Sequence, residues 1–178
     1  ETIPGPDGNP ITLPDGTVLR PTARIEGVSE RRPQEILVGL NNRSPQFHDL
    51  YLVDIGTGEM ELVQRNDAYA GFVTDDDYNV RLAVQMTPDG GVQYYMAKEG
   101  GEGEERAFEP WLKVGMEDAV TTGPAGFDKT GKVLYMLDSR GRDTGALTAL
   151  NLETGEQEVL AEDPRADAGG VLAHPTEK

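Results

Sequence analysis

Serine and histidine side chains give the first test of what chemistry this chain could perform. A serine nucleophile needs an imidazole beside it to take its proton. The chain has three serines, Ser29, Ser44 and Ser139, and two histidines, His48 and His174. None of the serines lies in the Gly-x-Ser-x-Gly pattern that exposes the nucleophile of α/β-hydrolases. The sequence therefore predicts no catalytic residue in this chain.

Patterns that bind metals or phosphates are also scarce. Cysteine is absent, and neither histidine lies at the spacing of a zinc site. The run Asp75-Asp76-Asp77 could hold Ca²⁺, but it lacks the alternating spacing and the distal glutamate of a calcium loop, so a solvated turn is favoured. The glycine-rich stretch 100–105 is acidic and lacks the lysine of a phosphate-binding loop. We expect neither a metal nor a cofactor.

Three arginines, Arg43, Arg140 and Arg142, are the weak candidates for substrate binding. The guanidinium fork binds carboxylates, and a peptide C-terminus is a carboxylate. Alternatively, each fork pairs with an acid close in the sequence and fixes its own loop. The nearest such acids are Asp49, Asp138 and Asp143. In so acidic a chain internal pairing is favoured, and the substrate-binding residues stay unknown.

The charge balance excludes several partners. The 178 residues include 32 acidic and 16 basic side chains, which gives a formal net charge of −16. Nucleic acids and anionic membranes attract cationic surfaces, so we expect neither as a partner. A chain without cysteine suits a reducing compartment, and the cytoplasm is the expected location. Because the chain begins at Glu1 rather than at Met, we expect a processed or excised piece.

Short apolar segments separated by turn residues predict an all-β fold. Residues 36–40 and 49–54 form two such segments, and a Gly-Thr-Gly turn at 56–58 leads into the alternating segment 59–63. The same order recurs at 133–137 and 146–150, followed by Thr154-Gly155 and an alternating segment at 156–160. No segment keeps a helical apolar period over three turns, so the helix content should be very low.

This recurrence is an internal repeat with an offset of 97 residues. Arg43 aligns with Arg140, Asp54 with Asn151 and Gly58 with Gly155, without a gap. One further unit fits between the two copies, so each unit has about 48 residues, the size of a four-stranded propeller blade. The innermost strands should lie near 70–74, 123–127 and 169–173.

We therefore predict a partial β-propeller of about three four-stranded antiparallel blades, plus the first strand of a fourth. The blades should span roughly 23–66, 67–116 and 117–163, with the next beginning at 164–178. Residues 1–22, with five prolines, should be a leader or loop that contains a small hairpin at 13–18. A closed propeller has four or more blades, so the chain should be part of a larger ring. A β-sandwich with two coincidentally similar hairpins is the alternative fold.

Six longer segments of residues 23–178 are informative together: ARIEGVSERRP at 23–33, LNNR at 40–43, HDLYLVD at 48–54, AGFVT at 70–74, LDSRGRD at 137–143 and EDPRADAGG at 162–170. They resemble the N-terminal propeller of prolyl oligopeptidase family serine peptidases, above all the bacterial acylaminoacyl-peptidase-like and dipeptidyl-peptidase-like members. In that family the propeller caps a C-terminal α/β-hydrolase domain, which carries the whole catalytic triad. The resemblance thus implies a non-catalytic domain that gates and helps to bind short peptides for the hydrolase domain.

A freestanding propeller that binds proteins or ligands is the alternative function. A glycosidase is also conceivable, since 32 acids could supply paired carboxylates, but the Ser-x-Asp-x-Gly-x-x-Trp box of sialidases is absent. The expected partners are the hydrolase domain of the parent protein, short peptides, and further copies of the chain through open blade edges. The sequence downstream of Lys178 would separate the first two functions, because only a peptidase needs a Gly-x-Ser-x-Gly segment there.

Overall fold

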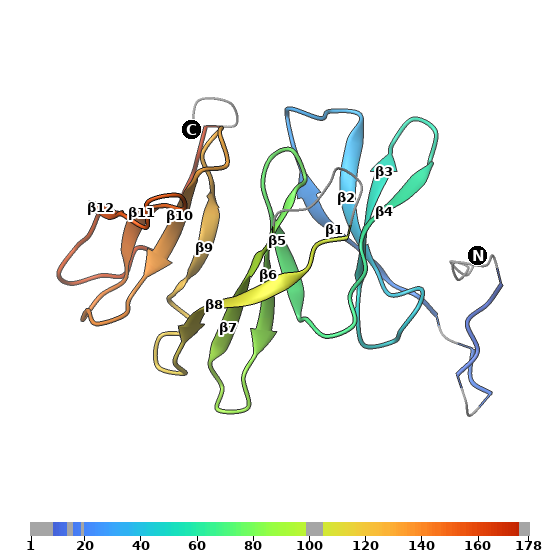
Figure 1. Cartoon of the computed structure of the whole chain (residues 1–178), viewed down its shortest axis with the longest axis horizontal. Coiled ribbons are helices and arrows are strands. Elements are labelled where there is room, and N and C mark those ends of the chain that lie inside the picture. Colours follow the sequence, from blue (N-terminus) through green and yellow to red (C-terminus); the bar gives the residue numbers. More distant parts are fainter. Residues whose placement is uncertain (1–8, 14–15, 19, 99–104, 175–178) are drawn as a thin grey trace.

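A computed structural model describes residues 9–13, 16–18, 20–98 and 105–174 of the chain. Every regular element in these ranges is a β-strand, and the strands form three antiparallel sheets of four (Figure 1). Blade 1 contains β1 (Ala23–Val28), β2 (Glu35–Leu40), β3 (Asp49–Asp54) and β4 (Met60–Gln64). Blade 2 contains β5 (Gly71–Thr74), β6 (Val80–Met86), β7 (Val92–Ala97) and β8 (Phe108–Val114). Blade 3 contains β9 (Gly123–Phe127), β10 (Val133–Asp138), β11 (Ala146–Asn151) and β12 (Gln157–Ala161).

Each sheet keeps its strands in sequence order, so each is a simple meander. The three sheets lie side by side, with blade 2 between the other two (Figure 1). The all-β partial propeller predicted from the repeat is thereby confirmed.

The hydrophobic cores lie between the sheets. One cluster joins blade 1 to blade 2 and contains Leu37, Leu50, Tyr78 and Val80. A second cluster joins blade 2 to blade 3 and contains Leu82, Val92, Tyr94, Val114, Phe127, Leu134 and Met136. Blade 2 therefore buries both of its faces, and the two outer blades bury one face each.

The first strands of blades 2 and 3 are less exposed than the fourth strands of the three blades. Strands β5 and β9 have no fully exposed residue, whereas the fourth strands β4, β8 and β12 each have several. In β1 all but one residue are exposed; within the described residues, blade 1 shares a hydrophobic cluster with blade 2 only.

The repeat is reproduced closely in the outer hairpins of blades 1 and 3. Asp54 Oδ1 accepts hydrogen bonds from the amides of Gly56 and Thr57, and Asn151 Oδ1 accepts the matching pair in blade 3. Gly58 and Gly155 have φ values of 76° and 74°. An L-residue with a side chain adopts this left-handed backbone at a cost, which explains why glycine stands at both positions.

The central strand pairs of the same blades differ by one residue. In blade 1 Leu40 pairs with Asp49, but in blade 3 the residue at the position of Leu40, Leu137, pairs with Leu147. The β10–β11 loop, 139–145, has one residue fewer than the β2–β3 loop, 41–48. A one-residue shift moves a strand's side chains to the opposite face. Accordingly Leu50 is buried in β3, and in β11 Thr148 is buried rather than Leu147.

One expected strand is not formed. Residues 169–173, predicted to begin a fourth blade, have no strand structure, and all of them are exposed. A strand needs a neighbour for its backbone hydrogen bonds, and no further strand lies beside this segment in the described part of the chain. Just before this segment, the amide of Ala168 donates a hydrogen bond to the carbonyl of Gly145.

In the leader, an isolated antiparallel bridge joins Thr12 to Val18. Residues 14 and 15 of the expected hairpin lie outside the described ranges. So does the glycine-rich stretch 100–105, apart from Glu105.

Candidate functional site

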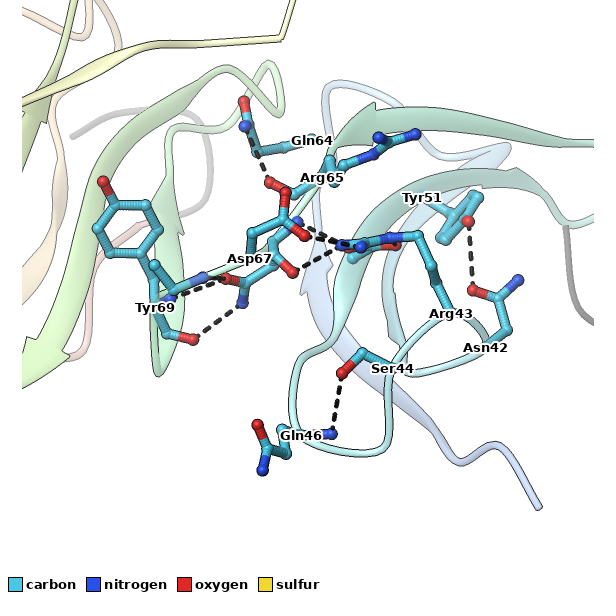
Figure 2. Close-up of polar contacts among 12 residues, drawn as sticks. Asn42, Arg43, Ser44, Gln46, Tyr51, Gln64, Arg65, Asp67 and Tyr69 are labelled. Carbon is cyan, nitrogen blue, oxygen red and sulfur yellow. Dashed lines mark hydrogen bonds and ion pairs between the residues drawn. The ribbon is translucent and has the colours of Figure 1, made fainter. Parts of the chain in front are cut away.

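Arg43 lies at the centre of a polar network at the end of blade 1. Its Nε and Nη2 donate to the two carboxylate oxygens of Asp49, each at 2.9 Å, and its Nη1 lies 2.7 Å from Asp67 Oδ1. Figure 2 shows the side chains of Arg43 and Asp67 pointing toward one another. The bonds to Asp49 are the main cause that raises the pKa of Arg43. The guanidinium is thus held by one acid of its own blade, Asp49, and by one acid of the β4–β5 connection, Asp67.

Asp49 and Asn66 connect this network to the loop that leads into blade 2. Asp49 is buried and also accepts the amide hydrogen of Asn66. The side chain of Asn66 in turn accepts from the amides of Ala68 and Tyr69 and donates to the Tyr69 carbonyl. The network therefore fixes the β4–β5 connection, and with it the ring of Tyr69, which packs edge-on against Tyr95 and Phe108.

Arg140 occupies the matching place in blade 3 but uses a different acid. Its Nε and Nη2 donate to the carboxylate of Asp138 at 2.8 and 2.7 Å. Burial alone would raise the pKa of Asp138, yet the bonds from Arg140 and Gln157 outweigh it and hold that pKa below its usual value. The acid is the last residue of β10, whereas Asp49 is the first residue of β3. Both arginines therefore donate two hydrogen bonds to one aspartate, but that aspartate lies on β3 in blade 1 and on β10 in blade 3.

Arg142 pairs with Glu162 at 2.6 Å, and not with Asp143, the acid closest to it in sequence. The glutamate is 60% exposed, whereas the side chains of Asp49 and Asp138 are 3% and 8% exposed. All three arginines thus have an acid partner within the chain. The structure does not unite them in one site, because Arg43 belongs to blade 1 and the other two follow β10 of blade 3.

The Asp75-Asp76-Asp77 run forms the turn between β5 and β6. Asp75 Oδ1 accepts from the amides of Asp77 and Asn79, and Oδ2 accepts from Arg81 at 3.1 Å. Its carboxylate therefore caps the turn, and with 9% of the side chain exposed it is less solvated than the sequence interpretation expects. No three potential metal ligands come together among the residues that the structure describes.

The serine hydroxyls have partners other than imidazole. Ser139 is buried, and its Oγ donates to Asp118 Oδ1 at 2.7 Å and lies 2.7 Å from Thr121 Oγ1 and 3.0 Å from Thr122 Oγ1. His48 Nε2 lies 3.2 Å from Thr22 Oγ1, and burial lowers the pKa of its imidazole. Sequence reasoning missed the cluster around Ser139, since partners 17 to 21 residues apart leave no local pattern.

Sequence reasoning also missed a cleft between blades 1 and 2. Its volume is about 530 Å³, within the range of small-ligand sites. The apolar lining comes from Leu52, Leu62, Val63, Tyr78 and Val80, and the polar lining from Arg32, Glu61, Asp77, Asn79 and Arg106.

No helix in the described residues is long and apolar enough to cross a membrane. No protein-family model matches the chain, and no solved structure matches it either.

Two curated proteins are similar in sequence. Dipeptidyl aminopeptidase BIII of Pseudoxanthomonas mexicana is 43% identical over 155 residues, which cover 86% of this chain and 22% of the relative. Dipeptidyl peptidase family member 6 of Caenorhabditis elegans is 35% identical over 149 residues, covering 82% of this chain and 20% of the relative. The chain thus spans about a fifth of the length of these relatives. Both names agree with the resemblance found in residues 23–178, which is thereby confirmed.

Proposed function

We propose that this chain is the non-catalytic propeller portion of a dipeptidyl-peptidase-like serine peptidase, where it limits access of peptides to a separate α/β-hydrolase domain and contributes contacts to them. The observation that carries the proposal is the similarity to two dipeptidyl peptidases over only a fifth of their length. A segment of that size, folded as three blades, leaves most of such a protein for the remaining blades and a catalytic domain.

The contacts of the polar side chains support a non-catalytic role. The Ser139 hydroxyl is engaged with an aspartate and two threonines, and the Ser29 and Ser44 hydroxyls each accept a nearby backbone amide. These bonds stabilise loops. A nucleophile would instead need an imidazole positioned to take its proton.

Among the three arginines, we favour Arg142 as a contact for the substrate carboxylate. Its partner Glu162 lies in solvent, so a peptide carboxylate could replace it at little cost. Arg43 and Arg140 are held by buried aspartates, and removing either fork would leave a buried charge uncompensated.

The test compares the source protein with the isolated chain. We expect the source protein to release dipeptides from a dipeptidyl-anilide and the chain Glu1–Lys178 to release none. Ser139→Ala in the source protein should leave the turnover unchanged. Turnover by the isolated chain that is lost on Ser139→Ala would refute the non-catalytic role. A source protein without turnover and without a Gly-x-Ser-x-Gly segment would favour the freestanding binding module.

The cytoplasmic location expected from the cysteine-free sequence stays a prediction, which cell fractionation would test.

A further inference from the structure

The turn between β1 and β2, residues 29–34, carries two adjacent arginines, both of which contact blade 2 and one of which also contacts blade 3. Arg31 Nη2 lies 3.1 Å from Asp77 Oδ2 in the β5–β6 turn of blade 2. Its Nη1 donates to the carbonyl of Lys129, at 3.0 Å, in the β9–β10 turn of blade 3. One guanidinium thus joins the first three blades.

Arg32 fixes the base of the same turn. Its Nε donates to Glu35 at 2.6 Å, and its Nη1 donates to the Asp77 carbonyl at 3.2 Å. The guanidinium carbon also lies 5.5 Å from the centre of the Tyr78 ring, a cation–π geometry. Both arginines therefore use the turn of blade 2, and only Arg31 continues to blade 3.

Tyr78 also connects blades 1 and 2, because it lies in the β5–β6 turn of blade 2 and its side chain binds the backbone of blade 1. Its hydroxyl accepts the amide hydrogen of Ser29 and donates to the carbonyl of Glu35. Its φ of 65° lies in the left-handed region, where the matching turn of blade 3 has Gly131 at 70°. A tyrosine in this conformation is strained, and such strain persists only where the surroundings fix it. Here the two hydrogen bonds to blade 1 do so.

These contacts lie where the three blades converge. The turns 29–34, 75–79 and 128–132 each follow the first strand of a blade, and first strands line the central channel of a propeller. The turns converge closely enough for one arginine to reach from the first to the third. In a closed ring, the polar clasp of Arg31, Arg32 and Asp77 would therefore lie at one mouth of the central channel.

We propose that this clasp limits the size of the peptides admitted through that mouth, with Arg31 as a specificity-determining residue. The inference rests on the proposed function. Arg31 holds the turns of blades 1 and 3 against the turn between them, so the mouth cannot widen there without breaking its two bonds. These bonds are exposed, with Arg31 and Asp77 40% and 47% exposed, so they can break and re-form in solution.

The experiment uses the full-length source protein with Arg31→Ala. The ratio of kcat/KM for a twenty-residue peptide to kcat/KM for a dipeptidyl-anilide should rise about threefold to tenfold, since losing a weak ion pair and one hydrogen bond shifts an opening equilibrium by that order. Lys129→Ala is the matched control, because it keeps the carbonyl that Arg31 uses. Arg31→Lys keeps the charge but cannot reach both partners, so it should behave like Arg31→Ala.

The outcomes separate the two proposals. A wild-type protein that cleaves both substrates, with an unchanged ratio in Arg31→Ala, would overturn the clasp alone. A wild-type protein that cleaves neither would overturn the proposed function together with the clasp. Hydrogen exchange at the amides of 128–132 should accelerate in Arg31→Ala and not in Lys129→Ala. Equal exchange in both variants would also count against the clasp, and a folding defect would appear instead as faster exchange in all three blades.

Discussion

Arg43 and Asp49 form the most buried ion pair of the candidate site, and their value to the fold can be measured. Asp49→Ala should destabilise the chain by about 2 kcal/mol, because Arg43 Nε and the Asn66 amide lose their acceptor while Arg43 keeps its ion pair with Asp67. Urea unfolding would give the change. Asp163→Ala is the control, since its ion pair with Arg165 is long, at 3.9 Å, and exposed. Equal effects of both variants would contradict a structural role for the buried pair.

The depressed pKa of Asp138 predicts how stability changes with pH. A carboxyl whose pKa is lower in the folded than in the unfolded chain stabilises the fold above its unfolded pKa, about 4, and loses that contribution as pH falls through the folded value. Asp89, with a pKa of about 2, and Asp128 act in the same direction. The chain should therefore lose stability as the pH falls below about 4 and through the lowered folded pKa values of these three carboxyls. Asp138→Asn should flatten this loss in urea titrations across that range. A slope equal to that of the wild type would contradict the assignment.

At the scale of the element, the turn glycines can be compared as matched sites. Gly58→Ala and Gly155→Ala should each cost about 1 kcal/mol, because both have positive φ and free space around the added methyl group. Gly131→Ala should cost more, since its Cβ would lie 2.5 Å from Arg81 Nη1 as well. Thermal or urea unfolding of the three variants gives the order. Equal losses at all three sites would mean that Arg81 moves aside freely.

Local signals in the sequence account for the strands and the outer hairpins. The turn residues Asp54, Gly58, Asn151 and Gly155 act within five residues of one another in each copy, so the repeat and the turn chemistry were predictable together. The one-residue shift between the central strands was not, because it depends on loop length and on which face the neighbouring blade buries. The segment 169–173 has strand-like residues, but strand formation also needs a partner.

The candidate site was predictable only in part. Pairing of Arg43 and Arg140 with nearby acids follows from the local sequence. The contacts of Arg31 with Lys129 and of Tyr78 with Glu35 bridge 98 and 43 residues, and nothing in the local pattern indicates them. Their existence depends on how the blades pack.

At the scale of the whole molecule, the two unpaired blade faces predict self-association of the isolated chain. On blade 1, Ile25 and Val28 are 68% and 74% exposed, and every residue of β12 in blade 3 is exposed. Burying apolar area yields about 25 cal/mol per Å², while salt at 0.15 M screens the repulsion of the net charge beyond about 8 Å. Light scattering after size exclusion should show oligomers at micromolar concentration. A monomer of 19.3 kDa throughout would contradict the prediction.

The placement of both hydrophobic clusters between sheets has a consequence for how the fold comes apart. Blade 2 has a stabilising neighbour on each side, and blades 1 and 3 have one each, so the chain is a short linear stack whose stability is a sum of units and interfaces. In a linear stack, unfolding starts at a terminal unit and travels inward, because that step breaks a single interface. A closed ring has no terminal unit, and removing any blade from it must break two interfaces at once. Ring closure therefore raises the barrier to unfolding as well as the equilibrium stability. A closed propeller should unfold more slowly than an open stack of the same blades.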